Sequence, residues 1–140
     1  MQQDVIDYRP DLVLIAFGLN DACGGATVEE FAQGYQCMID QLRKALPDAT
    51  LVAVNLYYMH ESFYTSCEGW THSSYTLTDQ FNEVIEQLAE KNELLYADVY
   101  AAQKGVDWAV CADHCHPNDL GHLLIANRVF EAIMRNCSLR

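Results

Sequence analysis

Three short apolar runs, separated by segments with helical periodicity, constrain the fold of this chain most strongly. The runs are residues 12–17 (LVLIAF), 51–56 (LVAVNL) and 94–99 (LLYADV). A run that is apolar on both faces is typical of a buried parallel strand. Strands that alternate with helices indicate an α/β fold with right-handed crossovers. We therefore expect a single α/β domain with a parallel sheet over residues 1–140, a length close to the ~150 residues of a typical domain.

The segments between these runs carry helix signals. Thr27 and Glu30 form a capping-box pattern, and apolar residues at helical spacing follow until Pro47 ends the helix. Similar spacing predicts helices around residues 81–88 and 120–133. Ligand sites of parallel sheets lie at the carboxyl ends of the strands. We therefore expect the chemistry in the three segments that follow the strands, which are residues 18–25, 57–78 and 101–117.

The charge balance excludes several partners. The chain has 20 acidic and 8 basic residues and a net charge of −12. Affinity for nucleic acids and for anionic membrane surfaces comes from Lys and Arg, so neither is an expected partner. No apolar run approaches the ~18 residues of a membrane span. The start at Met1 has no signal-peptide pattern, which predicts a cytoplasmic domain and leaves open a signal peptide upstream. The six cysteines are then expected to be free thiols, with disulfides as the alternative.

The first polar motif is Gly18-Leu19-Asn20-Asp21, directly after the first strand. A carboxamide in this place can donate its N–H to a developing oxyanion. Asn and Asp are also common turn residues, so a simple turn is the alternative interpretation.

The second motif is Asp113-His114-Cys115-His116-Pro117, just before the last predicted helix. One turn of chain can bring the Asp113 carboxylate to the His116 imidazole, which fixes the tautomer and raises the basicity of the ring. The alternative is an ordinary helix start, with Pro117 in its favoured first position.

The same loop raises a metal hypothesis and a redox hypothesis. Cys111, His114, Cys115 and His116, together with Asp113, form a dense cluster of potential zinc ligands. A structural zinc site usually pairs two such clusters, and the rest of the sequence offers no second one. Cys111 and Cys115 do not have the Cys-x-x-Cys spacing of a redox motif. We therefore expect no metal and no other cofactor.

Aromatic residues are concentrated in residues 57–78. A loop of this length is usually functional or disordered. Its aromatic side chains could form the floor of a substrate pocket, for example by stacking on a sugar ring, or they could cover the core. The predicted substrate-binding residues are Tyr57, His60 and Trp70 of this segment, together with Asp21.

Taken together, the two motifs resemble the SGNH (GDSL-type) hydrolase family. Gly18 to Asp21 is similar to the third sequence block of that family, and Asp113 to His116 is similar to the fifth. The continuation at residues 117–122 (PNDLGH) also resembles the family's entry into its last helix, and the resemblance covers nearly the whole chain in the right order. It implies a three-layer, flavodoxin-like fold and an ester or acyl hydrolase with a Ser-His-Asp triad. By the same resemblance, His116 is the general base, Asp113 orients it, and Asn20 is the oxyanion donor, with Gly18 in the same catalytic block.

One part of the family pattern is missing. The family places its nucleophile in a Gly-Asp-Ser motif on its first strand, and none of the five serines of this chain stands in such a motif: Ser62, Ser66, Ser73, Ser74 and Ser138. We therefore expect the natural protein to be longer by two βα units, roughly 60 residues, at its amino end. Without them, residues 12–17 form an exposed apolar edge strand that is prone to self-association or to pairing with another chain.

Two hypotheses for function follow. The first is an ester hydrolase of the SGNH type whose small-molecule substrate is a carboxylic ester, such as an O-acetylated carbohydrate. The second is a non-catalytic relative that keeps the pocket and binds a glycan or a protein partner.

Overall fold

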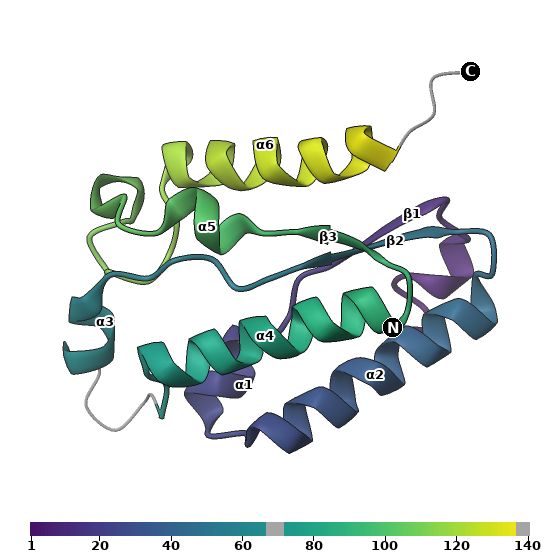
Figure 1. Cartoon of the computed structure of the whole chain (residues 1–140), viewed down its shortest axis with the longest axis horizontal. Coiled ribbons are helices and arrows are strands. Elements are labelled where there is room, and N and C mark those ends of the chain that lie inside the picture. The colour runs from purple at the N-terminus through teal and green to yellow at the C-terminus, as the bar shows by residue number, and fades with distance from the viewer. Residues whose placement is uncertain (67–71, 137–140) are drawn as a thin grey trace.

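The computed structural model describes residues 1–66 and 72–136. Its centre is a parallel sheet of three strands, β1 (Leu12–Ile15), β2 (Thr50–Val54) and β3 (Leu95–Ala97), in the order β1-β2-β3 (Figure 1). The α/β class and the parallel sheet predicted from the apolar runs are therefore confirmed.

Helices cover both faces of this sheet (Figure 1). On one face, α2 (Val28–Ala45) and α4 (Tyr75–Lys91) pack side by side, with the short α1 (Leu19–Gly24) next to them. On the opposite face lies α6 (Asp119–Asn136), which packs against β2, β3 and α5 (Val99–Gln103). The remaining described elements are α3 (Glu61–Ser66) and the 3₁₀ turns η1 (Ile6–Tyr8) and η2 (Asp107–Ala109).

The central strand divides the core in two because successive side chains point to opposite faces. Leu51 and Ala53 are buried in the cluster formed with α2 and α4, whose largest members are Phe31, Tyr35 and Phe81. Val52 and Val54 are buried in a second cluster with residues of α6, including Val129 and Ala132. A strand buried on both faces must be apolar throughout, which explains why the sequence of β2 is a continuous apolar run.

The edge strand β1 is covered on one face only. Leu14 lies beside Val52 in the parallel register, so both side chains point to the α6 face of the sheet. Val52 is fully buried, whereas Leu12 and Leu14 are 43% and 48% exposed. Helix α6 therefore covers β2 and β3 but leaves the same face of β1 open.

The helix signals of the sequence are confirmed, and three short helices were missed. Thr27 Oγ1 accepts a hydrogen bond from the Glu30 amide at 3.1 Å, and the Glu30 carboxylate accepts one from the Thr27 amide at 2.9 Å. The predicted helices correspond to α2, α4 and α6. Helices α1, α3 and α5 are six residues long or shorter and carry no apolar period of their own.

No helix in the two described stretches of the chain combines the length and the apolar character needed to cross a membrane.

Candidate active site

The chain leaves β1 through a glycine at which any side chain would be strained. Gly18 has φ of +130°, a conformation that side chains rarely adopt. A Cβ atom on Gly18 would lie 3.0 Å from the Phe31 ring and 3.1 Å from the Leu56 side chain. The motif at residues 18–21 is thus the start of α1, rather than an isolated turn, and Gly18 is its N-cap.

The exposed side chains of this helix start face a cleft of about 520 Å³ at the carboxyl ends of the strands. Five of the predicted site residues line it: Gly18, Asn20, Asp21, Tyr57 and His116. The structure therefore brings the two sequence motifs together across about 90 residues of chain. The full lining is Ala16, Phe17, Gly18, Leu19, Asn20, Asp21, Val54, Asn55, Leu56, Tyr57, Val99, His116, His122 and Ile125.

Asp113 and His116 form a hydrogen-bonded pair at one wall of this cleft. Asp113 Oδ2 lies 2.7 Å from His116 Nδ1. Asp113 Oδ1 accepts two further hydrogen bonds, each 3.0 Å long, from the backbone amides of Cys115 and His116. A carboxylate that binds Nδ1 leaves Nε2 as the ring nitrogen that can exchange a proton with another group. This is the arrangement of a general base and the residue that orients it.

The same hydrogen bonds fix the charge of the carboxylate. The backbone amides of Cys115 and His116 and the His116 ring stabilise the ionised form and lower the pKa of Asp113 to about 2 from its ordinary 3.8. Asp113 is therefore an anion throughout the physiological pH range and can stabilise a positive charge on the imidazole.

A network of backbone and carboxamide hydrogen bonds holds the loop that carries Asp113 and His116 on α6. We refer to this loop, residues 110–118, as the predicted catalytic loop. Asn118 Oδ1 accepts from the amides of Leu120 and Gly121, at 3.0 and 3.2 Å, and Asn118 Nδ2 donates to the Trp108 carbonyl at 2.8 Å. Gly121 lies against η2, where an added Cβ would overlap the Ala109 carbonyl oxygen. Small size at Gly121 and the carboxamide of Asn118 together set the position of His116.

The structure places the predicted substrate-binding residues Tyr57 and His60 in different surroundings. Tyr57 lines the cleft, and its hydroxyl is hydrogen-bonded to the Cys115 thiol below the catalytic loop; burial raises the pKa of this phenol. His60 is not part of the cleft lining and lies on the other side of the loop, 3.7 Å from Asp107. Trp70 lies outside the described residues.

Sequence reasoning did not name His122, Ile125 and Asn55 as site residues, although they line the cleft. His122 and Ile125 reach it from the first two turns of α6, and Asn55 reaches it from the end of β2. The polar Asn55 at the end of an otherwise apolar strand was the available signal, because such positions face the ligand edge of a parallel sheet. Its carboxamide binds Asp98, Tyr96 and the amides that start α5, so it also fixes the β3–α5 connection.

The metal and redox hypotheses find no support in the arrangement of the loop. Within residues 1–66 and 72–136, no three His, Cys, Asp or Glu side chains are placed to hold a metal ion. Cys111 is exposed and contacts the Pro117 carbonyl, whereas Cys115 is buried against Met59. The two thiols thus point to different surroundings, and no disulfide joins the cysteines of the described part.

None of the serines in the part of the chain that the structure describes lines the cleft. Among the described serines, Ser73 is buried with its hydroxyl 3.4 Å from that of Thr78, and Ser74 caps α4 by accepting from the Leu77 amide. The described lining of the cleft therefore brings the His116 imidazole, paired with Asp113, together with the Asn20 carboxamide and contains no serine hydroxyl.

Solved structures share this fold. A lipase/acylhydrolase from Enterococcus faecalis superposes with a TM-score of 0.78 at 24% identity, over 96% of this chain and 67% of that one. An acetylxylan esterase from Geobacillus stearothermophilus superposes with a TM-score of 0.75 at 21% identity, over 94% of this chain and 63% of that one. In that esterase, a serine, an aspartate and a histidine have each been replaced in catalytic mutants, and its aspartate and histidine are three positions apart.

The sequence comparisons agree with the structural ones. An acetylxylan esterase from Geobacillus stearothermophilus is 26% identical over 140 residues, and this chain spans 63% of its length. The sequence model of the GDSL-like lipase/acylhydrolase family matches residues 1–124, which include both motifs of the cleft. The chain therefore belongs to the GDSL-like lipase/acylhydrolase family.

Proposed function

We propose that this chain supplies the base and oxyanion side of a serine ester hydrolase. The observation that carries the proposal is the Asp113–His116 pair at 2.7 Å, whose histidine lines the same cleft as Asn20. His116 is the general base, Asp113 orients it, and Asn20 donates to the oxyanion.

The reaction follows from these positions. A serine hydroxyl near His116 Nε2 gives its proton to that nitrogen as its oxygen attacks the ester carbonyl carbon. The carboxamide of Asn20 donates a hydrogen bond to the carbonyl oxygen as it becomes negative. The intermediate collapses and the alcohol leaves with the proton held by His116. Water, deprotonated by the same nitrogen, then releases the acid from the acyl-enzyme.

The serine comes, in this proposal, from a segment that adds a strand to the open side of β1. Ala16 and Phe17, which follow β1, already line the cleft, so the carboxyl end of an adjacent parallel strand lies next to His116. Exposed apolar residues mark the surface that this segment covers. On β1 and after it they are Leu12, Leu14 and Phe17, and on α6 they are Leu123, Phe130 and Met134. The 37% of the acetylxylan esterase that this chain does not span is long enough for such a segment.

The substrate we propose is an acetylated carbohydrate. One relative is described as an acetylxylan esterase and as an acetyl-xylooligosaccharide esterase. The net charge of −12 favours a neutral substrate over an anionic one.

A second candidate function is binding without catalysis, to a glycan or a protein partner. The observation that favours it is that the cleft takes no serine from residues 1–66 and 72–136. In that case, the exposed face of β1 and α6 is the surface for a partner or for a second copy of the chain.

A serine-directed fluorophosphonate distinguishes the two candidates. The probe is applied to the full-length protein, and the labelled peptide is identified by mass spectrometry. The hydrolase proposal predicts one labelled serine and slow labelling in His116→Ala, with unchanged labelling in the control His72→Ala. Absence of labelling in the wild-type protein would overturn the hydrolase proposal and favour binding.

A further inference from the structure

A second group of ring and carboxylate side chains lies behind the catalytic loop, outside the cleft. His60 and His114 place their ring centroids 5.1 Å apart at an angle of 34°. The His60 amide donates to the His114 carbonyl at 3.1 Å, which joins the loop after β2 to the catalytic loop. We refer to His60, His114, Asp107 and Trp108 as the outer cluster.

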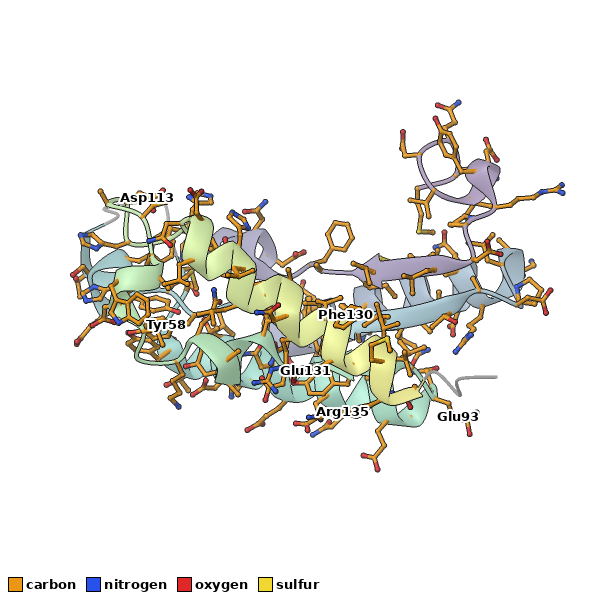
Figure 2. The ribbon with its side chains drawn as sticks, turned by 90° about the horizontal axis from the view of Figure 1, so that it is seen from above. Tyr58, Glu93, Asp113, Phe130, Glu131 and Arg135 are labelled. Carbon is orange, nitrogen blue, oxygen red and sulfur yellow. The ribbon has the colours of Figure 1, made fainter. Side chains whose placement is uncertain are left out.

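The carboxylate of the outer cluster is held rigidly. Asp107 Oδ1 accepts from the Tyr58 hydroxyl at 2.8 Å, and Asp107 Oδ2 lies 3.7 Å from His60 Nε2. Tyr58 is buried and Asp107 is exposed, so the anchored carboxylate faces solvent. Figure 2 shows Tyr58 and Asp113 at the same end of the molecule. The cluster therefore lies at the end of the molecule that carries the catalytic loop.

The cluster also presents ring faces that the core does not use. Trp108 follows Asp107 on η2 and is 70% exposed, and its carbonyl is fixed by Asn118. His114 is exposed and has φ of +62°, whereas the next residue, Cys115, is buried. Trp108 therefore offers an exposed indole on η2, next in sequence to the anchored Asp107 carboxylate.

The distance between the outer cluster and the base suits a neighbouring sugar ring. His114 and His116 are two residues apart, so their Cα atoms are separated by at most ~7 Å. An oligosaccharide with one acetylated unit at His116 can therefore place an adjacent unit on the His114 side of the loop. Apolar ring faces pack against the C–H face of a sugar, while carboxylate and imidazole groups bind its hydroxyls.

We propose that the outer cluster is a subsite for a neutral sugar ring next to the ester that is cleaved. This inference rests on the hydrolase proposal only for the identity of the neighbouring unit. Binding of the sugar itself does not require the serine. A metal ion is a poor alternative ligand, because within residues 1–66 and 72–136 no three His, Cys, Asp or Glu side chains are placed to hold one.

The test is a titration of the isotope-labelled chain with xylotetraose, a neutral oligosaccharide without acetyl groups, followed by amide and indole NMR signals. We expect shifts at His60, Asp107, Trp108 and His114, and a loss of affinity of about tenfold, or ~1.4 kcal/mol, in Trp108→Ala. His114→Gly should weaken binding as well, and glycine tolerates the positive φ at this position. The matched control is Tyr8→Ala, because Tyr8 on η1 is 79% exposed and belongs to neither the cleft nor the cluster.

Each outcome decides the proposal. Weaker binding in Trp108→Ala and His114→Gly, with wild-type binding in Tyr8→Ala, supports the subsite. Wild-type affinity in both cluster variants, or shifts confined to the cleft, overturns it. No binding by the wild-type chain also overturns it, and this result leaves the hydrolase proposal intact because fluorophosphonate labelling tests that proposal separately.

Discussion

Asp113 holds His116 in two ways at once: Oδ2 lies 2.7 Å from the ring nitrogen Nδ1, and Oδ1 accepts from the His116 backbone amide at 3.0 Å. The carboxylate therefore fixes both the ring and the piece of backbone that carries it. Because the imidazole itself is exposed, this double attachment, rather than burial, gives the ring its orientation.

The two attachments predict how Asp113 titrates. The backbone amides of Cys115 and His116 lower the pKa of Asp113 more than the His116 ring does. In His116→Ala, the backbone amides remain, so the pKa of Asp113 should rise above its wild-type value of about 2 but stay below the ordinary 3.8. Carboxyl ¹³C shifts against pH measure it. A pKa at or above 3.8 in the variant would show that the ring alone stabilises the anion.

The same titration has a consequence for stability. A carboxylate with a lower pKa in the folded state than in the unfolded state stabilises the fold at pH above about 4, and this contribution is lost as the pH falls toward 2. Asp113→Asn should therefore unfold more easily than wild type at pH 7, and the difference should shrink at pH 2. Urea unfolding at the two pH values measures this. An equal difference at both values would contradict the assignment.

Two glycine-to-alanine substitutions should change the unfolding free energy in opposite directions. Gly121→Ala places a Cβ against the Ala109 carbonyl oxygen, and relieving that overlap should cost ~1–3 kcal/mol of unfolding free energy. Gly34→Ala on α2 meets nothing within 4 Å and should stabilise by ~0.5–1 kcal/mol. Denaturant unfolding measures both. A neutral Gly121→Ala would mean that η2 and α6 do not pack as closely as described.

Replacing Asn118, which precedes α6, should lower stability, whereas replacing Asn127 on α6 should not. Asn118→Ala removes the caps on the Leu120 and Gly121 amides and the contact to Trp108, and should cost ~1–2 kcal/mol. Asn127 is exposed on the same helix, so Asn127→Ala should stay within ~0.5 kcal/mol of wild type. Equal effects of the two substitutions would argue against the anchoring network.

The open edge of β1 predicts association that depends on concentration. Lysine on an edge strand discourages pairing. Leu14→Lys should therefore weaken self-association in analytical ultracentrifugation, whereas Gln87→Lys, at an exposed position of α4, should leave it unchanged. A wild-type chain that stays monomeric at high concentration, or equal association in both variants, would contradict a role for this edge.

The sequence predicted those features that depend on local spacing. Apolar runs and helical periods located all three strands and the helices α2, α4 and α6. The three-residue spacing of Asp113 and His116 was enough to predict their contact, because a single turn of chain closes it. The edge position of β1 followed only from the family resemblance, since no local pattern distinguishes an edge strand with apolar residues from a central one.

Features that depend on the path of long loops could not be predicted. His60 was grouped with the cleft, yet its place is set by the backbone hydrogen bond between the loop after β2 and the catalytic loop, 54 residues further along. Helices α1, α3 and α5 are too short to show a period and are fixed by tertiary contacts such as that of Asn55 with the start of α5. His122 was missed as a cleft residue because the rotation of α6 decides which of its side chains reach the cleft.

The central claim is that His116 is the general base of ester hydrolysis. The most direct test measures steady-state hydrolysis of 4-nitrophenyl acetate by the full-length protein. The rate of the wild type is compared with those of His116→Ala and of the control His72→Ala. We expect a fall in kcat of about 10²–10⁴ for His116→Ala with the fold intact, and wild-type rates for His72→Ala. A His116→Ala variant that keeps kcat within about twofold of wild type, well below the effect of a lost general base, would contradict it.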